Sequence, residues 1–187
     1  MRLRIIAGDL GGRYIDAPPG RRTRPTAARV REAWFSALGE DVVSARVADL
    51  YAGSGALGIE ALSRGAAHVH FVESDRGVAS VLDRNIRRLG LANRSRIGRR
   101  DALAWIDGLT APLDLVFADP PYGSTAGRGL VERFRHRPFA AQFWLEHDAD
   151  AGLAATADWT REYGDTRVSR FLAPACTPIS TPERKLG

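Results

Sequence analysis

The sequence predicts an α/β fold with a mostly parallel sheet, in a chain of 187 residues that suits one domain with a small appendage. From residue 46 onward, short apolar runs typical of strands alternate with segments of helical periodicity. This alternation is typical of a parallel sheet covered by helices on both faces. The run LDLVFADPP at 113–121 is strongly apolar, as a buried parallel strand should be. A glycine-rich loop separates the first strand of this region from its first helix.

Residues 1–45 are predicted to form an N-terminal extension made of a small β-hairpin, an Arg-rich segment and a helix. The runs LRIIA (3–7) and RYIDA (13–17) flank a Gly-rich turn, which indicates the hairpin. The stretch APPGRRTRPT that follows has the composition of a loop. Apolar residues then recur at helical spacing through 28–38, and Thr26 is the expected N-cap of that helix.

Residues 46–172 are predicted to form the main α/β domain. The expected strands cover 46–52, 68–74, 95–102, 113–121 and 143–148, with helices over 55–65, 77–90, 102–109 and 128–137. Gly90 is the expected C-terminal stop of the second of these helices. Two short β-like runs around Tyr163-Gly164-Asp165 predict an antiparallel C-terminal hairpin over 158–172. Residues 173–187 are rich in Pro, Ser and Thr and are interpreted as a tail.

Arginine is clustered along the chain, which carries a net charge of +5. Residues 1–31 contain eight Arg, residues 87–100 contain six, and residues 128–137 contain four. Arg pairs with phosphate and stacks on bases, so the clusters indicate contact with nucleic acid. A GC-rich genome would explain the preference for Arg over Lys with the side chains simply solvated, but it would not explain the clustering.

The sequence gives no indication of secretion or of membrane insertion. No apolar run approaches the ~18 residues that a membrane span needs, and the N-terminus does not resemble a signal peptide. Cys176 is the single cysteine, which excludes an internal disulfide and a Cys-based zinc site. We therefore expect a cytoplasmic protein that has no bound metal and is a monomer.

The segment Gly53-Ser54-Gly55-Ala56-Leu57-Gly58 is a G-x-G-x-x-G motif between a predicted strand and a predicted helix. Glycines let the backbone turn tightly and approach a ligand closely. Glu73, at the end of the second strand, can accept hydrogen bonds from ribose hydroxyls. Both nicotinamide cofactors and S-adenosyl-L-methionine fit this pattern, and a loop that merely packs a helix on a strand is the structural alternative.

Two acids favour S-adenosyl-L-methionine as the cofactor. Asp49 lies in the first strand, four residues before Gly53, where a carboxylate suits the cationic methionine end and would repel a pyrophosphate. Asp101-Ala102 ends the third strand, where a side chain and a backbone N–H can bind the adenine edge, although an Asp there is often only a helix cap. The expected cofactor-binding residues are Asp49, Ala52, Gly53, Ser54, Gly55, Gly58, Glu73, Ser74, Asp101 and Ala102.

The tetrapeptide Asp119-Pro120-Pro121-Tyr122 ends the fourth strand, at the sheet edge where α/β proteins bind ligands. An exocyclic amino nitrogen of a nucleobase is a poor nucleophile because its lone pair is delocalised into the ring. The Asp119 carboxylate and the Pro120 carbonyl can hold its two hydrogens, and Tyr122 can stack on the base. Asp119, Pro120 and Tyr122 are therefore the expected catalytic residues, although Asp-Pro-Pro is also good turn chemistry. With the glycine loop, they make residues 46–172 the expected cofactor-binding catalytic domain.

The chain resembles the bacterial 16S ribosomal RNA guanine-N2 methyltransferases of the RsmD type, within the Rossmann-like class I methyltransferases. The resemblance runs from about residue 4 to 170 through RIIAGDLGGRYIDAP, TRPTAARVREAWFSAL, ADLYAGSGALGIEALSRGA, FVESD and VFADPPY. It implies methylation of guanine 966 N2 of 16S RNA in small-subunit particles. It also implies that the substrate-binding residues are Arg24, Pro25, Thr26, Arg29, Arg31 and Pro121. Ala27-Ala28 and Tyr51 depart from the family pattern.

Two other functions remain open at this point. Adenine-N6 methyltransferases of DNA also carry D-P-P-Y, but they usually have a recognition domain for which residues 1–45 leave little room. A non-catalytic RNA-binding module of the same fold is the alternative outside enzymes, and the intact Asp119 and glycines count against it. A methyltransferase acting on proteins or small molecules would leave the Arg clusters without a partner.

Overall fold

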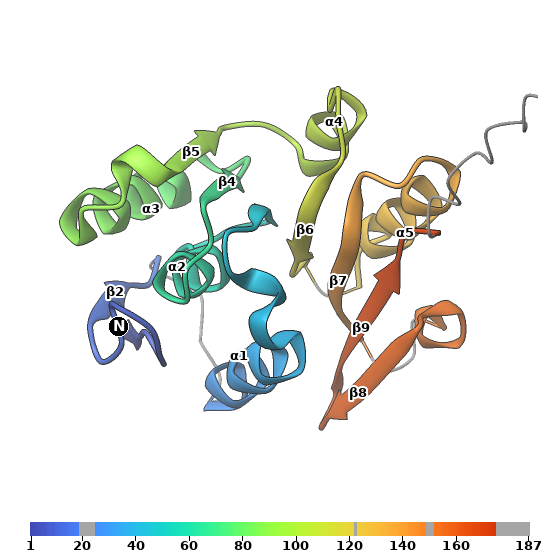
Figure 1. Ribbon diagram of the computed structural model, residues 1–187, viewed down its shortest axis with the longest axis horizontal. Coiled ribbons are helices and arrows are strands. Elements are labelled where there is room, and N and C mark those ends of the chain that lie inside the picture. Colours follow the sequence, from blue (N-terminus) through green and yellow to red (C-terminus); the bar gives the residue numbers. More distant parts are fainter. Residues whose placement is uncertain (19–24, 122, 149–151, 175–187) are drawn as a thin grey trace, which may run out of the picture.

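The computed structural model describes residues 1–18, 25–121, 123–148 and 152–174. Within them, seven strands form one central sheet in the order β5-β4-β3-β6-β7-β9-β8, and β1 and β2 form a separate hairpin (Figure 1). The pairs β5-β4, β4-β3, β3-β6 and β6-β7 are parallel, whereas β7-β9 and β9-β8 are antiparallel. The predicted fold class is thereby confirmed, including both hairpins.

The strands are β1 Arg2–Arg4, β2 Tyr14–Asp16, β3 Arg46–Leu50, β4 His68–Val72, β5 Ser95–Gly98, β6 Leu113–Ala118, β7 Ala140–Asp148, β8 Trp159–Tyr163 and β9 Thr166–Leu172. The α-helices are α1 Pro25–Leu38, α2 Ala56–Ser63, α3 Arg76–Leu89, α4 Ala102–Asp107 and α5 Ala126–His136. Short 3₁₀ turns cover Gly39–Val42, Ala92–Arg94 and Leu153–Thr156. Each predicted element exists, and the differences lie in the boundaries.

Two helix ends test the sequence-based reasoning directly. Gly90 follows α3 in the left-handed conformation (φ 75°), as predicted for a C-terminal stop. The prediction that Thr26 is the N-cap of α1 is wrong, because the helix already begins at Pro25. Proline suits the first helical position, since its fixed φ is helical and its missing N–H would have no intrahelical partner there.

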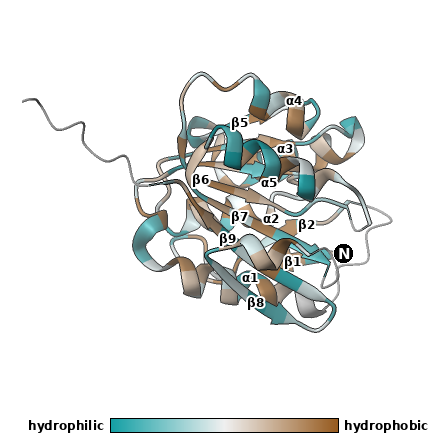
Figure 2. Cartoon of the chain, turned by 90° about the vertical axis from the view of Figure 1, so that its right-hand side faces the viewer, coloured by the Kyte–Doolittle hydropathy of each residue, from teal (hydrophilic) through white to brown (hydrophobic). Residues whose placement is uncertain are grey.

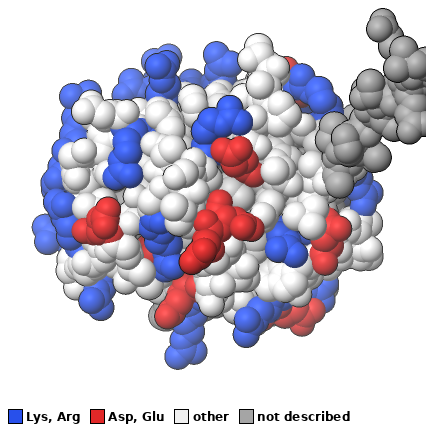
Figure 3. Space-filling view, in the orientation of Figure 1, with Lys and Arg blue, Asp and Glu red and all other residues white. Residues whose placement is uncertain are grey.

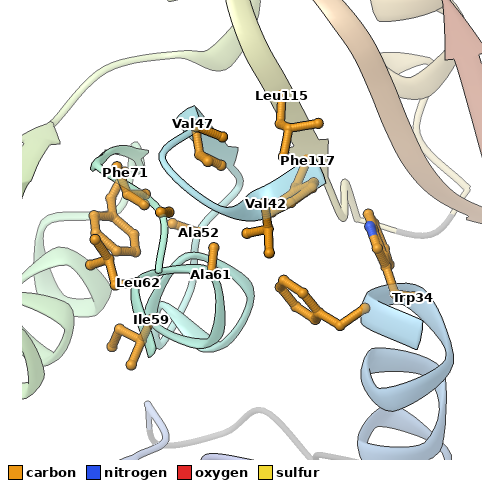
Figure 4. Close-up of a cluster of buried hydrophobic side chains, with 14 of the residues drawn as sticks. Trp34, Val42, Val47, Ala52, Ile59, Ala61, Leu62, Phe71, Leu115 and Phe117 are labelled. Carbon is orange, nitrogen blue, oxygen red and sulfur yellow. The ribbon is translucent and has the colours of Figure 1, made fainter. Parts of the chain in front are cut away.

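The sheet separates two apolar clusters. One contains α1 and α2 side chains: Trp34 of α1 is fully buried, stacks on Trp144 of β7 and meets Phe117 of β6 edge to face. Figure 4 shows this cluster, with Trp34 pointing from α1 toward the sheet and Phe71 on the side of α2. The second cluster joins α4 and α5 to the other face through residues such as Leu130 and Phe134. Figure 2 shows the resulting pattern, with apolar strands in the centre and polar helix surfaces outside.

The N-terminal hairpin is anchored to α2 by Glu60, which is fully buried. Its carboxylate accepts the backbone N–H groups of Ile6 (2.8 Å) and Ala7 (3.0 Å) and pairs with Arg64. Ile5 and Ile15 of the hairpin belong to the same apolar cluster as α1 and α2. The extension therefore packs on the α/β region through a shared core.

No helix among the described residues is long and apolar enough to cross a membrane.

Candidate functional site

The site lies where β3 and β6 end side by side. The two strands are parallel neighbours with Leu50 opposite Ala118, so the loops that follow them leave the same edge of the sheet. The glycine loop (residues 53–58) begins three residues after Leu50, and Asp119 comes directly after Ala118. The glycine loop and the D-P-P-Y segment therefore follow neighbouring strands of the sheet.

The glycine loop turns through a run of left-handed residues. Tyr51, Gly53 and Gly55 have φ values of 57°, 58° and 84°. This conformation is easy for glycine and costs a tyrosine roughly 1–2 kcal/mol, so the packing of Tyr51 into the α4–α5 cluster must hold it there. Gly58 meets a different demand: a Cβ at this position would lie 2.3 Å from Phe71 Cε1. Gly58 therefore allows α2 to pack closely on β4.

Asp49 is buried beneath this loop, with 2% of its surface exposed. Its Oδ2 accepts the Gly58 N–H at 2.9 Å, near the start of α2. Burial raises the pKa of Asp49 well above its usual value; the Gly58 hydrogen bond opposes this, and the negative charges of Asp119 and Glu73 raise the pKa further. Asp119 and Glu73 therefore both lie close enough to Asp49 for their charges to act on its carboxyl group.

Glu73 joins the end of β4 to the glycine loop. Its two oxygens accept the backbone N–H groups of Gly53 (3.0 Å) and Asp75 (2.9 Å), and the residue is 9% exposed. Ala52 reinforces the junction by donating its N–H to the Val72 carbonyl at 3.1 Å. The carboxylate is thus fixed at the strand end, and the adjoining Ser74 is exposed.

Asn85 is a site residue that the sequence analysis missed. It is fully buried on α3, and its side-chain N–H groups bond the carbonyls of Ser54 (3.0 Å) and Asp16 (2.9 Å). Its Oδ1 accepts the Asp16 N–H, so one amide ties the N-terminal hairpin to the glycine loop. A signal was present in the sequence: Asn85 is a polar residue three or four positions from Leu82 and Leu89, on the apolar face of α3.

Asp101 acts as the N-cap of α4, accepting the Ala104 N–H at 2.9 Å. This matches the cap that the sequence left open as an alternative. The strand itself is shorter than expected, since β5 ends at Gly98 and Asp101 lies three residues beyond it. Ala102 begins the helix and is buried. A contact of these two residues with a cofactor stays a prediction.

The D-P-P-Y loop (residues 119–122) begins with a partly exposed Asp119, a buried Pro120 and an exposed Pro121. Its fourth residue, Tyr122, lies outside the described residues. Beyond it the chain turns back, because Ser124 N–H bonds the Pro121 carbonyl at 3.2 Å. The described part of the loop therefore follows β6 directly, at the same sheet edge where β3 ends.

The two arginines of α1 that were expected to face RNA, Arg29 and Arg31, do not lie on the same side of the helix. Arg24 lies outside the described residues, and Pro25 and Thr26 form the start of α1. Arg29 is exposed on α1. Arg31 does not face outward as expected, because its side chain is buried and only 7% exposed. It donates a hydrogen bond to the Arg4 carbonyl at 2.6 Å and lies 3.9 Å from a carboxylate oxygen of Glu60. On a helix, two positions turn a side chain about 200°, so Arg29 and Arg31 face opposite ways.

The donor set fits a cationic nucleoside cofactor. Three carboxyl groups, those of Asp49, Glu73 and Asp119, gather at the end of the sheet and would repel a pyrophosphate, whereas they favour a positively charged ligand. Gly53 is left-handed and has no side chain at this point of the loop. Gly55 meets a packing demand instead, because a Cβ there would lie 2.4 Å from Leu82 Cδ1 in the core. The arrangement can hold a cation and present Asp119 next to it.

Comparisons with known proteins agree with this geometry. The sequence model of the family described as "Conserved hypothetical protein 95" matches residues 3–159. Ribosomal RNA small subunit methyltransferase D of Escherichia coli is 40% identical over 131 residues, which are 70% of this chain and 64% of that protein. Its counterpart in Haemophilus influenzae is 32% identical over 167 residues, covering 84% of this chain and 85% of that protein.

The solved structure of the protein yhhF from Escherichia coli superimposes with a TM-score of 0.83 at 31% identity, covering 94% of this chain and 99% of that one. The chain thus covers just under two thirds of the length of the Escherichia coli methyltransferase D and nearly all of the yhhF structure. With a family model matched over most of its length, the chain belongs to the Conserved hypothetical protein 95 family, the RsmD family, and has its Rossmann-like methyltransferase fold.

Proposed function

We propose that the protein transfers a methyl group from S-adenosyl-L-methionine to N2 of guanine 966 in 16S ribosomal RNA, within small-subunit particles. The observation that carries the proposal is the junction of β3 and β6, which sets Asp119 of the D-P-P-Y loop within electrostatic reach of Asp49 beneath the glycine loop. A cationic methyl donor and an amino nitrogen would meet at this junction. The two relatives named ribosomal RNA small subunit methyltransferase D support the choice of substrate.

The cofactor would lie against Asp49, the glycine loop and Glu73, where it would supply an electrophilic methyl group. Asp49 would face its positive charge, and Glu73 would accept from its ribose hydroxyls while holding the loop through Gly53. Asn85 would act indirectly, by fixing the Ser54 carbonyl and thus the shape of the loop.

Asp119 and Pro120 would hold the guanine amino group. The Asp119 carboxylate and the Pro120 carbonyl accept its two N–H groups, which aims the nitrogen lone pair along the edge that holds Asp49. Prolines at 120 and 121 lack N–H donors and have fixed φ, so the carbonyls keep their direction. Positive charge that develops on the nitrogen is stabilised by the Asp119 carboxylate, and Tyr122 would stack on the base.

Exposed arginines supply two candidate RNA surfaces. One is Arg29 on α1. The other covers α3, β5 and the turn after β5, where Figure 3 shows Lys and Arg side chains gathered along the left and upper margin. Its exposed arginines include Arg84, Arg87, Arg96, Arg99 and Arg100. A groove of about 520 Å³ on this surface is lined by Asp83, Ile86, Arg87, Ala92, Ser95, Ile97 and Arg99. The proposed substrate implies a cytoplasmic protein.

Replacing Arg29 should weaken RNA binding in a salt-dependent way. Arg29→Ala should lower the slope of log affinity against log salt by about 0.7–0.9 if the side chain neutralises one phosphate. Binding to unmodified small subunits would be measured at several salt concentrations. Arg46→Ala is the matched control, since Arg46 is also exposed but lies at the amino end of β3, away from the site. An unchanged slope in Arg29→Ala would place the RNA elsewhere.

The proposed function is tested by radiolabel transfer from S-adenosyl-L-methionine, with small subunits lacking the modification, naked 16S RNA and duplex DNA offered side by side. Label recovered as N2-methylguanosine at position 966 of the subunits is the expected result. Label in DNA as N6-methyladenine would keep the mechanism and overturn the substrate. Binding of RNA with no transfer to any of the three would favour a non-catalytic module.

A further inference from the structure

β7 extends past the end of β6, and this overhang lies beside the D-P-P-Y loop. Ala118, the last residue of β6, pairs with Leu145 in parallel register, whereas β7 continues to Asp148. Three residues of β7, 146–148, therefore lie beyond the last residue that pairs with β6. Pro120 and Pro121 have no N–H to donate, so the backbone ladder of β6 and β7 cannot simply continue there.

A side chain bridges this gap. Asp148 Oδ2 accepts the backbone N–H of Gly123 at 3.0 Å, directly after Tyr122. Gly123 is left-handed (φ 71°), and the Ser124 N–H to Pro121 carbonyl bond closes the turn around it. These two hydrogen bonds tie the chain to β7 and back to Pro121 as it leaves the D-P-P-Y loop.

Asp148 is itself held by a buried polar network. His147 is 6% exposed; its Nδ1 lies 2.9 Å from the Asp148 carbonyl and its Nε2 lies 2.8 Å from Ser169 Oγ. Because a carbonyl can only accept, Nδ1 carries the proton, and in the neutral ring Nε2 accepts from Ser169. Thr160 continues the network with its hydroxyl 2.8 Å from Ser169 Oγ. Burial lowers the pKa of His147, which favours this neutral form. The backbone of Asp148 is thus fixed from β8 and β9.

We propose that Asp148 is a positioning residue whose carboxylate latches the D-P-P-Y loop to the end of β7 and so holds Asp119 and Pro120 in line for methyl transfer. The inference rests on the proposed function of residues 119–122 and adds a residue on another strand to it. Asp148 acts through Gly123 and does not touch the methylated base. Without the latch, the turn that follows the loop loses its tie to the sheet and the loop samples more conformations.

Asp148→Ala should reduce kcat for methyl transfer to small subunits by at least ~10-fold, since small displacements of positioned groups cost this much or more. The affinity for S-adenosyl-L-methionine should stay within about 2-fold, because the glycine loop follows β3. Asp148→Asn keeps an acceptor oxygen and should retain most of the activity. Hydrogen exchange followed by NMR should show protection of the Gly123 amide falling at least ~10-fold in Asp148→Ala.

Asp158→Ala is the matched control. Asp158 also accepts a backbone N–H through its carboxylate, from Leu172 at 2.8 Å, but Leu172 pairs with Gln142 at the opposite end of β7. This variant should leave kcat and the Gly123 amide unchanged, and thermal melts of all three variants show whether each is folded at the assay temperature.

The latch is overturned if Asp148→Ala keeps its kcat or its Gly123 protection, if Asp148→Asn is as inactive as Asp148→Ala, or if Asp158→Ala loses as much activity. Failure of the proposed function looks different. The unaltered protein would then transfer no label to small subunits, while the exchange of the Gly123 amide, which needs no substrate, still decides whether Asp148 holds the loop.

Discussion

Asp119→Ala should reduce the turnover of methyl transfer by at least ~10²-fold while S-adenosyl-L-methionine still binds. The alanine removes both the acceptor for one amino hydrogen and the negative charge beside the nitrogen, interactions that strengthen in the transition state; losing one such group typically costs this much. Single-turnover transfer to small subunits and equilibrium binding of the cofactor separate the two effects. Because Asp119 also raises the pKa of Asp49, its loss should not impair the ionisation on which cofactor binding depends.

Asp114→Ala provides the control on the same strand. Asp114 lies near the amino end of β6, where its carboxylate bonds the Arg46 backbone N–H at 2.7 Å. Its removal should change stability slightly and leave turnover unchanged. If Asp119→Ala retained turnover, Asp119 would have no role in holding the amino group, and the chemistry assigned to the D-P-P-Y loop would be wrong.

Asp49→Asn should weaken binding of S-adenosyl-L-methionine by roughly 10–100-fold, the range expected when a hydrogen-bonded charge partner is lost. Asparagine keeps an oxygen that can accept the Gly58 N–H, so the glycine loop should stay intact. Calorimetric titration of the folded variant measures the effect, and the unaltered protein supplies the reference.

The pH dependence gives a second signature of Asp49. Its pKa in the folded, cofactor-free protein is raised, chiefly by burial, and a cationic ligand favours the ionised carboxylate. Cofactor affinity should therefore rise as pH increases through that raised pKa and level off above it, and Asp49→Asn should remove the rise. An Asp49→Asn variant with unchanged affinity and an unchanged pH profile would exclude contact between Asp49 and the cofactor.

The stability of the cofactor-free protein should change with pH in the opposite direction to the cofactor affinity. The pKa of Asp49 is higher in the folded than in the unfolded state, so the folded state binds more protons, and stability falls as pH rises from about 3.9 through the raised value. Above that window the cofactor-free Asp49→Asn protein should melt higher than the unaltered one, by about 2–4 °C for each kcal/mol recovered. Differential scanning calorimetry without cofactor measures this gain, which would show that Asp49 is kept at a cost to stability.

Local patterns in the sequence determined which elements form. Apolar alternation, helical spacing and glycines at turns act over a few residues, so the order of strands and helices and the stop at Gly90 could be predicted. Motif spacing placed Asp49, Glu73 and Asp119 at strand ends, and the rules of parallel sheets then brought β3 and β6 together.

Only the tertiary structure decided where individual polar side chains point. In the sequence, Arg29 and Arg31 are equivalent members of one Arg cluster. The helix turns their side chains to opposite sides, so that Arg31 lies in the interior beside Glu60. Asn85 and Asp148 belong to no recognisable sequence motif, because the residues they bond, Ser54 and Gly123, are 31 and 25 residues away in the sequence. The sequence by itself thus determined the fold class and the chemical groups at the strand ends, whereas the contacts that hold those groups in place depend on strand register and helix rotation, which only the packed chain defines.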